Sequence, residues 1–366
     1  MKTFQDIFHP YKNSFTFMRT VFAMMVILTH SYSTGGFPNE LLEFYSHGQL
    51  GFSCIGVFSF FLISGFLITR SLENSPALVQ FIINRILRLF PAYWACLIIT
   101  ATVFVPVIYF LEHQSFEGLW TLKEEVLKYI RLNFFMNVRR FAIGNLTEHC
   151  PFPKVINGSL WTLLNELKCY VVLLFVGSLA PRKALKFCIL ALTIFLLYMY
   201  QNYFLFHKLP QDIFPLPLDR HLLIHLTYFL FGSCFYLFMS KIPYSKILFV
   251  ISIGLMIVST VQGFYNIISP FTMAYILFFS VFTLPSVFQK LEGRGDFSYG
   301  LYLYGFPIQQ ILALIGLPRF GVFIHFLGSI FITFFPAAFS HFFIEKPALQ
   351  LKKKTRQFLT RVGNYS

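Results

Sequence analysis

The sequence predicts an all-α membrane protein, a polytopic bundle of about ten transmembrane helices, and three observations lead to this fold class. Of its 366 residues, 56% are hydrophobic and only 12% are charged, whereas about a quarter of the residues in soluble domains are charged. Fifty Phe and nineteen Tyr add more bulk than a soluble core would bury. The apolar runs are continuous over about 18–25 residues and do not alternate at every second residue, which favours helices over a β-barrel.

Ten apolar segments long enough to cross a bilayer follow one another along the chain. Their approximate limits are 15–32, 50–69, 89–111, 158–180, 186–204, 221–239, 246–263, 269–288, 297–315 and 320–343. We expect one integral membrane domain over residues 1–366, with a non-spanning loop at about 112–157 and a basic tail at about 346–366. Glu124, Glu125, Lys128 and Arg131 follow a helical pattern within the loop.

An even number of spans places both termini on the same side of the membrane. If that side is the cytoplasm, most of the 29 Lys and Arg residues lie in inner segments, as the positive-inside rule requires. The net charge of +14 then faces the anionic cytoplasmic leaflet and anionic cytosolic ligands, and nucleic acid is not an expected partner.

Arg19 and His30 lie inside the first apolar segment, where ionisable groups are costly and usually functional. Their spacing of eleven residues corresponds to three helical turns plus about 20°, so both side chains share one helix face about 16 Å apart along the axis. The alternative is structural: an arginine that snorkels to the interface and a histidine at the helix end. His225, His325 and His341 are isolated in their segments and are interpreted as packing or interfacial residues.

Two motifs follow on the next two segments. Ser64-Gly65 sits in a Phe-rich run and permits close approach by a ligand or, equally, by another helix. Arg85 and Arg88 are one turn apart ahead of Tyr93, and two guanidinium groups so placed suit a phosphate. An ordinary positive-inside anchor would show the same arginines.

The fourth segment opens with Asn157 and Trp161 and continues with Glu166 and Lys168. Two ionisable residues within a span imply either a polar cavity or structural pairing. The Trp161 ring suits a membrane interface or the wall of a sugar site. The Ser298–Tyr302 motif opens the ninth segment, and Glu345-Lys346-Pro347 closes the tenth. We interpret both as mainly structural, with Glu345 close enough to the cytoplasmic side to pair with Arg85 or Arg88.

The six cysteines are scattered and form no CxxC or His/Cys spacing, so we expect neither a disulfide framework nor a metal site.

These motifs in this order resemble the membrane-bound acyltransferase family 3. The resemblance rests on Arg19-x10-His30, the Gly56–Leu67 run, Arg85-x-x-Arg88, Asn157–Tyr170, Ser298–Tyr302 and Glu345–Pro347. It covers about residues 13–350. The resemblance implies transfer of acyl groups, commonly acetyl, to extracytoplasmic glycans such as lipopolysaccharide O-antigen, exopolysaccharide or peptidoglycan. The chain ends soon after the tenth segment, without the hydrolase-like domain of some members, which favours a stand-alone glycan O-acyltransferase. The resemblance also implies a location in the bacterial inner membrane, with membrane lipid and a surface glycan or lipid-linked saccharide as partners.

On this basis we expect acetyl-CoA as the acyl donor, docked on Arg85 and Arg88 and reaching inward past Ser64, Gly65 and Tyr93. His30 is the expected general base on a sugar hydroxyl, with Arg19 and Glu166 organising the catalytic site. Trp161, Asn157 and Tyr302 are assigned to the acceptor. The alternative is a transporter of glycan or acyl intermediates whose path the buried charges line.

The charge distribution makes the topology testable. A cysteine introduced by Glu125→Cys should react with an impermeant maleimide added from outside the cytoplasmic membrane, because residues 112–157 are expected on that side. Labelling from the cytoplasm alone would contradict the predicted topology.

Overall fold

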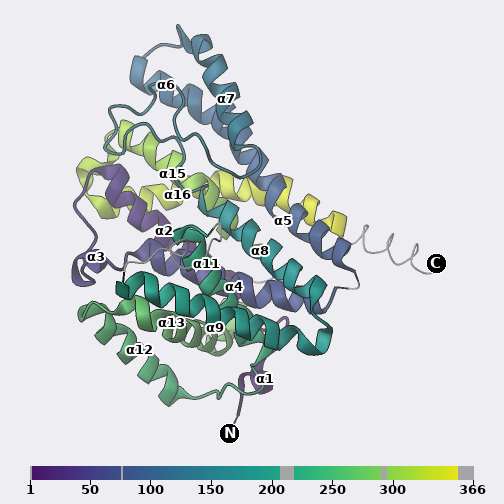
Figure 1. Cartoon of the computed structure of the whole chain (residues 1–366). Coiled ribbons are helices and arrows are strands. Elements are labelled where there is room, and N and C mark those ends of the chain that lie inside the picture. The colour runs from purple at the N-terminus through teal and green to yellow at the C-terminus, as the bar shows by residue number, and fades with distance from the viewer. Residues whose placement is uncertain (1, 76, 207–217, 290–294, 353–366) are drawn as a thin grey trace, which may run out of the picture. The chain divides into compact units, whose positions relative to one another are not determined.

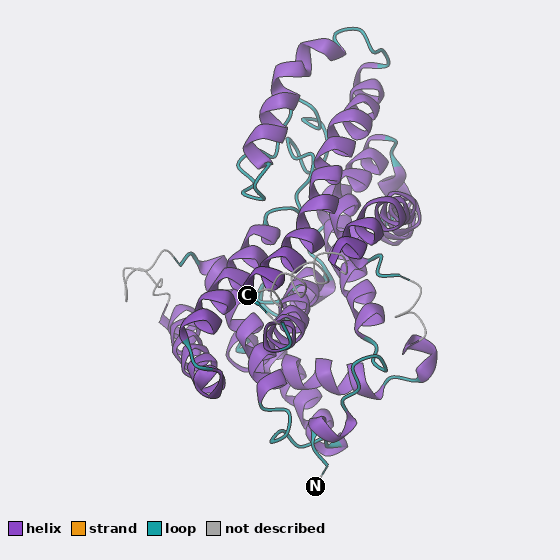
Figure 2. Ribbon diagram, turned by 90° about the vertical axis from the view of Figure 1, so that its right-hand side faces the viewer, coloured by secondary structure: helices purple, strands orange, loops and turns teal. Residues whose placement is uncertain are grey.

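Helices and the turns between them form the computed structural model over the residues that it describes, which are 2–75, 77–206, 218–289 and 295–352 (Figure 2). An isolated antiparallel bridge joins Thr3 to Pro243. The all-α fold class predicted from the continuous apolar runs is therefore confirmed.

The chain divides into two compact units, each built from separate stretches of sequence. Unit 1 comprises Met1–Phe22, Leu41–Leu78 and Asn165–Gly295, and unit 2 comprises Ala23–Glu40, Val79–Leu164 and Asp296–Ser366. Helix α2 (Phe15–Gly35) is one continuous element whose first eight residues are assigned to unit 1 and whose remainder is assigned to unit 2.

Unit 1 contains most of the helices from the N-terminal part and the centre of the sequence (Figure 1). Besides the start of α2, they are α1 (Phe4–Ile7), α3 (Leu41–Tyr45), α4 (Phe52–Glu73), most of α8 (Thr162–Leu179), α9 (Arg182–Phe206), α11 (Arg220–Leu237), α12 (Lys246–Val261), α13 (Tyr265–Thr283) and α14 (Ser286–Gln289).

Unit 2 contains the rest of α2 and two long helical runs that π-helical turns interrupt. Its elements are α5 (Leu78–Ile99), the π-helical η1 (Thr100–Phe104), α6 (Val105–His113), η2 (Leu119–Leu122), α7 (Lys123–Asn133), α15 (Ser298–Leu314), η4 (Leu317–Phe320), α16 (Val322–Ser340) and the π-helical η5 (His341–Glu345).

Each of the ten predicted segments contains a helix, but the number of membrane crossings is not confirmed as ten. Six helices of the described residues are long and apolar enough to cross a bilayer: Phe52–Glu73, Leu78–His113, Thr162–Leu179, Lys183–Phe206, Tyr265–Thr283 and Val322–Lys352. The third predicted segment begins earlier than expected, because the amphipathic stretch that holds Arg85 and Arg88 continues the same helix back to Leu78.

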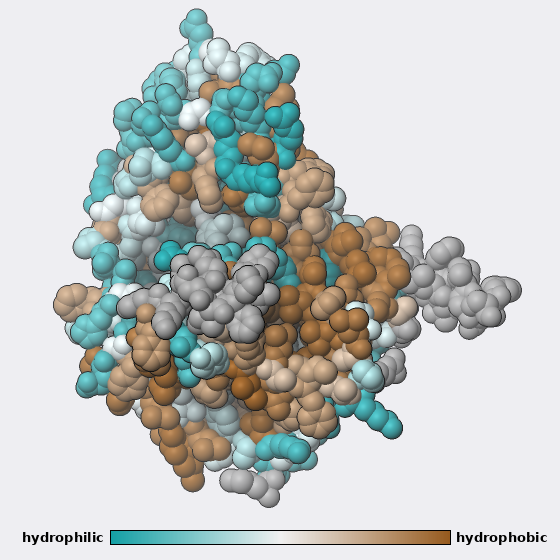
Figure 3. Space-filling view, in the orientation of Figure 1, coloured by the Kyte–Doolittle hydropathy of each residue, from teal (hydrophilic) through white to brown (hydrophobic). Residues whose placement is uncertain are grey.

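The helix predicted inside the 112–157 loop is present as α7. At eleven residues it extends about 16 Å, which is too short to cross a bilayer core. Figure 3 shows hydrophilic side chains gathered over the region of α6 and α7, in contrast to the hydrophobic surface that covers other helices.

Two glycines bring α4 and α11 together in unit 1. A Cβ atom on Gly65 would lie 1.8 Å from the Phe229 carbonyl oxygen, and one on Gly232 would lie 2.0 Å from the Leu62 carbonyl oxygen. Lipid tails are as apolar as the helix side chains, so the hydrophobic effect does not drive helices together within a bilayer. Small residues instead allow the close backbone packing that holds membrane helices together. Of the two interpretations of Ser64-Gly65, helix packing is therefore the one the structure shows at Gly65.

In unit 2, α15 is the central helix. Its residues from Ser298 to Gln310 are all buried, and Gly300 packs so closely on α16 that a Cβ atom there would lie 2.7 Å from the Cα atom of Ala337. A helix that is enclosed on all sides can present polar side chains to several neighbours, and the polar contacts of α15 are described below with the residues around His30.

The glycine contact predicts a specific loss of stability. Gly65→Ala should force α4 and α11 apart and lower the free energy of unfolding by about 1–3 kcal/mol, the usual cost of overpacking. The measurement is thermal unfolding in detergent. Gly254→Ala is the matched control, because a Cβ atom there meets nothing within 4 Å, and it should raise stability by about 0.5–1 kcal/mol. Equal effects of the two substitutions would contradict the packing role of Gly65.

Candidate active site

Arg19 and His30 both lie in α2, so the predicted placement of the two residues on a single helix is confirmed. In unit 1, the Arg19 guanidinium lies 3.5 Å from the Thr16 hydroxyl, one turn earlier. In unit 2, the His30 ring meets the edge of Phe306 of α15, with ring centroids 5.1 Å apart. The hydroxyls of Ser33 and Thr34 both donate to the His30 carbonyl, at 3.1 and 2.7 Å.

The backbone of α15 adapts to a proline next to that contact. Pro307 has no N–H group and therefore cannot donate to the carbonyl of Leu303, four residues earlier. The Asn157 side-chain amide donates to this carbonyl at 2.8 Å, while its oxygen accepts from the Ser159 N–H at 3.1 Å. Asn157 therefore replaces the hydrogen bond that Pro307 removes.

The segment around Asn157 is fixed to α15 at further points. A Cβ atom on Gly158 would lie 2.7 Å from the Phe306 ring, so only glycine fits against it. Thr162 makes a hydroxyl–hydroxyl contact with Tyr302. The Gln310 amide donates to the carbonyls of Phe152 and Val155 at 2.7 and 2.8 Å. One buried helix thus contacts residues 152–162 at several points, and one of these contacts is made by Phe306, the ring that also meets His30.

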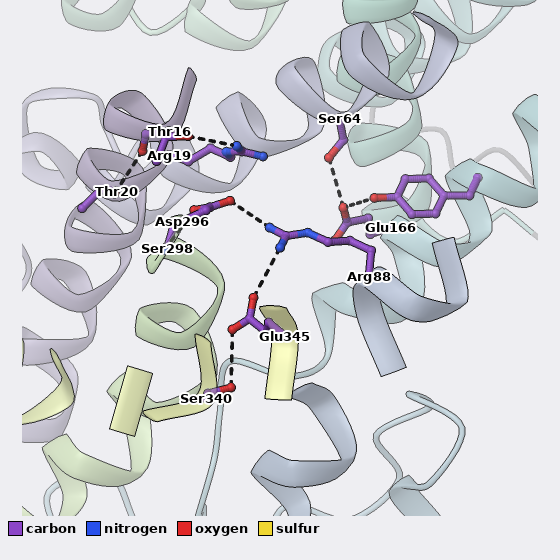
Figure 4. A network of polar contacts seen from close by, with 11 residues as sticks. Thr16, Arg19, Thr20, Ser64, Arg88, Glu166, Asp296, Ser298, Ser340 and Glu345 are labelled. Carbon is purple, nitrogen blue, oxygen red and sulfur yellow. Dashed lines mark hydrogen bonds and ion pairs between the residues drawn. The ribbon is translucent and has the colours of Figure 1, made fainter. Parts of the chain in front are cut away.

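Arg88 is paired with two carboxylates in unit 2 (Figure 4). Its guanidinium lies 2.9 Å from Asp296 and 3.3 Å from Glu345, and its cationic carbon lies 5.5 Å from the centre of the Tyr299 ring. Ser298 donates to Asp296 and Ser340 donates to Glu345. The expected pairing of Glu345 with one of the two arginines is confirmed for Arg88. Asp296 is a partner that the sequence did not indicate.

The other predicted donor residues of unit 2 have different surroundings. Arg85 lies over the Phe81 ring, with its cationic carbon 5.7 Å from the ring centre. Tyr93 is fully buried, and its hydroxyl donates to the Asn133 carbonyl at 2.6 Å. Tyr93 thus anchors α5 to the end of α7, and its place in a donor site stays a prediction.

Glu166 is held by hydroxyl groups in unit 1. It accepts from Ser64 at 3.0 Å and from Tyr170, one turn along α8 (Figure 4). The charged Lys168 side chain lies 3.9 Å from Asp219 with both groups largely exposed, so this pair is weak. Ser64 therefore contacts Glu166 through its hydroxyl, independently of the packing of the glycine that follows it, and its place in a donor site stays a prediction.

Two histidines interpreted as packing residues make polar contacts. His225 pairs with Asn165 at 3.0 Å and stacks on Phe61, within unit 1. His325, which is fully buried in α16, lies 3.0 Å from the Thr34 hydroxyl of α2, within unit 2. A histidine inside an otherwise apolar run was the available signal, but the sequence did not reveal its partner.

Comparison with known proteins identifies the family. The chain matches the model of the acyltransferase domain over residues 12–341 and belongs to this family, as the order of its motifs implied. It is 32% identical to an O-acetyl transferase of Shigella phage Sf6 over 313 residues, which cover 82% of this chain and 85% of the phage protein. It is 27% identical to nodulation protein 10 of Rhizobium leguminosarum bv. viciae over 168 residues, or 36% of this chain and 46% of that protein. No solved structure matches the chain.

Family membership and the apolar helices together define the class of protein. The chain is an acyltransferase with helices long and apolar enough to cross a membrane, and the transporter alternative has no support from these comparisons.

The Arg88 cluster predicts a strong dependence of stability on one cation. Glu345 is only 2% exposed, so Arg88→Ala would leave a buried carboxylate without its cation, and we expect a loss of about 3–5 kcal/mol in the free energy of unfolding. Lys128→Ala is the control, because Lys128 pairs with Glu125 at an exposed position where about 0–1 kcal/mol is expected. Thermal unfolding of both variants in detergent gives the comparison, and similar losses would contradict the prediction.

Proposed function

We propose that this protein transfers an acyl group, acetyl in the simplest case, from cytoplasmic acyl-CoA to a hydroxyl of an extracytoplasmic glycan or lipid-linked saccharide. The family supplies acyl transfer, and the name of the phage relative supports acetyl as the group and oxygen as the acceptor atom. The observation that carries the proposal is His30, a partly buried imidazole in α2 whose ring rests on Phe306. A neutral imidazole can accept a proton from a hydroxyl, and an ionisable group inside an apolar helix is usually functional.

In the proposed reaction, His30 alone carries the proton from the sugar hydroxyl to the thiolate of CoA. Its imidazole takes the proton of the sugar hydroxyl while the sugar oxygen attacks the thioester carbonyl, which forms a tetrahedral intermediate. The intermediate collapses, the carbon–sulfur bond breaks, and the thiolate of CoA takes up the proton from the imidazolium. The ester and the free thiol of CoA are the products, and His30 returns to its neutral form.

Arg85 is our first candidate for the donor phosphates. Arg88 was expected to share this task, but its guanidinium faces Asp296 and Glu345, so its positive charge is already balanced. A phosphate near Arg88 would meet two carboxylates. We therefore assign Arg88 chiefly to holding α5 to α15 and η5, and place phosphate binding on Arg85.

The acceptor is assigned to the segment that α15 holds beside Phe306. Trp161 is 36% exposed, and a partly exposed indole face suits the apolar face of a sugar ring. Asn157 and Tyr302 are buried, and their polar groups are hydrogen-bonded to Leu303 and Thr162, respectively. We therefore assign them to supporting the segment, and Trp161 to contact with the sugar.

Arg19 and Glu166 keep supporting electrostatic roles in the proposal. A cation near the start of α2 favours the anionic donor, whose phosphates carry negative charge. Glu166 accepts hydrogen bonds from two hydroxyl groups, and it is assigned to orienting a polar group of a substrate.

The test of the proposal is the loss of acylation in His30→Gln. If His30 is the general base, turnover should fall by about 10²–10⁴-fold, because glutamine keeps volume and hydrogen bonding but accepts no proton usefully. Ester-linked acetyl groups on surface polysaccharide would be measured by mass spectrometry of cells that carry each variant. Binding of acetyl-CoA to purified protein should be retained.

His149→Gln is the matched control, because His149 is exposed in the loop after α7 and should tolerate the same exchange. Substantial acetylation by His30→Gln would remove the base role. A large drop in the amount of surface polymer, with the remaining polymer normally acetylated, would instead indicate transport.

A further inference from the structure

Three residues of unit 2 form a chain of contacts that ends on the backbone of His30. His325 Nε2 lies 3.0 Å from Thr34 Oγ1, and Thr34 Oγ1 donates to the His30 carbonyl at 2.7 Å. His325 and Thr34 are both fully buried. The contact therefore links α16 to the last turns of α2 in a place that is closed to solvent.

The direction of these hydrogen bonds follows from the number of protons. The Thr34 hydroxyl has a single hydrogen, which it gives to the His30 carbonyl. Its oxygen must then accept from His325, so His325 carries its proton on Nε2. The Thr34 hydroxyl thus acts both as a donor and as an acceptor, and these two hydrogen bonds hold its side chain in one rotamer.

His325 stands out from the rest of the buried face of α16. The buried residues that follow it at intervals of about one turn are Ser329, Thr333 and Ala337, which are small and suit close packing of membrane helices. Close packing of helices would be met by a small residue at position 325, and it does not explain an imidazole there. A buried ring nitrogen needs a hydrogen-bond partner, and Thr34 is the partner of Nε2.

The end of α2 is the part of the helix that most needs such support. The carbonyls of a last turn have no partner within the helix, and the chain turns sharply at Gly36, whose φ angle is +73°. Gly35 approaches His325 so closely that a Cβ atom there would lie 3.4 Å from its ring. His325 thus touches the last turn of α2 at Thr34 and beside Gly35.

We propose that His325 is a positioning residue for the acyl transfer. Its Nε2–H group holds Thr34, Thr34 holds the carbonyl of His30, and the imidazole of His30 is thereby kept in its catalytic orientation against Phe306. The proposal rests on the proposed function of His30 as the base. It assigns to His325 no contact with substrate.

Four variants test this chain of contacts. His325→Phe keeps a ring but removes the donor, and Thr34→Val keeps the shape but removes the hydroxyl; each should lower kcat about tenfold and leave KM for acetyl-CoA unchanged. His325→Gln retains an N–H donor and should recover kcat to within about twofold of the unaltered protein. Ser33→Ala is the matched control, because the Ser33 hydroxyl donates to the same His30 carbonyl from within α2, so its effect should be about twofold at most.

The assay uses the full-length protein in membrane vesicles from cells that make the native acceptor. Radiolabelled acetyl-CoA is the probe, and label in hydroxylamine-labile esters is measured per amount of folded protein. The double variant His325→Phe/Thr34→Val should be no slower than the slower single variant, because both remove one contact.

Equal impairment of His325→Gln and His325→Phe, multiplying effects in the double variant, or an unchanged kcat in His325→Phe would each overturn the positioning role. The base role is judged separately, from His30→Gln in the same vesicles. An active His30→Gln would overturn the proposed function, while the order of the His325 variants would still report on the contact itself.

Discussion

Charged and polar groups within apolar helices need partners, and this constraint shapes both units of the protein. Arg88 is the clearest case, because its guanidinium satisfies two carboxylates that come from sequence positions more than 200 residues away. Asp296 precedes α15, and Glu345 ends the run that begins with α16. A single cation therefore joins three helical elements of unit 2 where hydrophobic contacts alone would not define their register.

The same requirement explains the surroundings of α15. Its proline leaves a carbonyl without a donor, and an asparagine from the chain before α8 supplies one. Gln309 donates to the Ile27 carbonyl and the Ser31 hydroxyl of α2, and Gln310 donates to two carbonyls on the opposite segment. Buried amides thus fix the part of α2 that carries His30, and the residues near Trp161, to the same helix, an arrangement that would suit the proton transfer proposed for His30.

Much of this arrangement was accessible from the sequence. Helical periodicity placed Arg19 and His30 in one helix, and the cost of an unpaired charge suggested the partner of Glu345. The carbonyl freed by Pro307 could also have been inferred, because a proline within an apolar run always frees the carbonyl four residues earlier. The identity of its new donor could not, since Asn157 lies 146 residues away in the chain. Asp296 follows a short Gly-rich stretch that reads as an ordinary turn, and His325 carries no sign of its contact with Thr34. Ten apolar segments are predicted as spans, whereas six helices of the described residues are long and apolar enough to cross a bilayer. Length and hydropathy in the sequence do not distinguish a helix in lipid from one enclosed by its neighbours.

The pairing of Asn157 with the carbonyl freed by Pro307 restricts the order in which these two positions can change during evolution. If Asn157 is lost first, the buried Leu303 carbonyl keeps only the weak 3.5 Å hydrogen bond from the Cys96 thiol, which is costly. If Pro307 is replaced first by a residue with an N–H group, α15 can close its own ladder, and the asparagine amide becomes the group that must find another acceptor. The second route has the less costly intermediate, because the amide of a side chain can change rotamer to reach another acceptor more easily than a helix carbonyl can move. Among related chains, a residue other than proline at position 307 should therefore accompany free variation at position 157, whereas proline should keep a donor there.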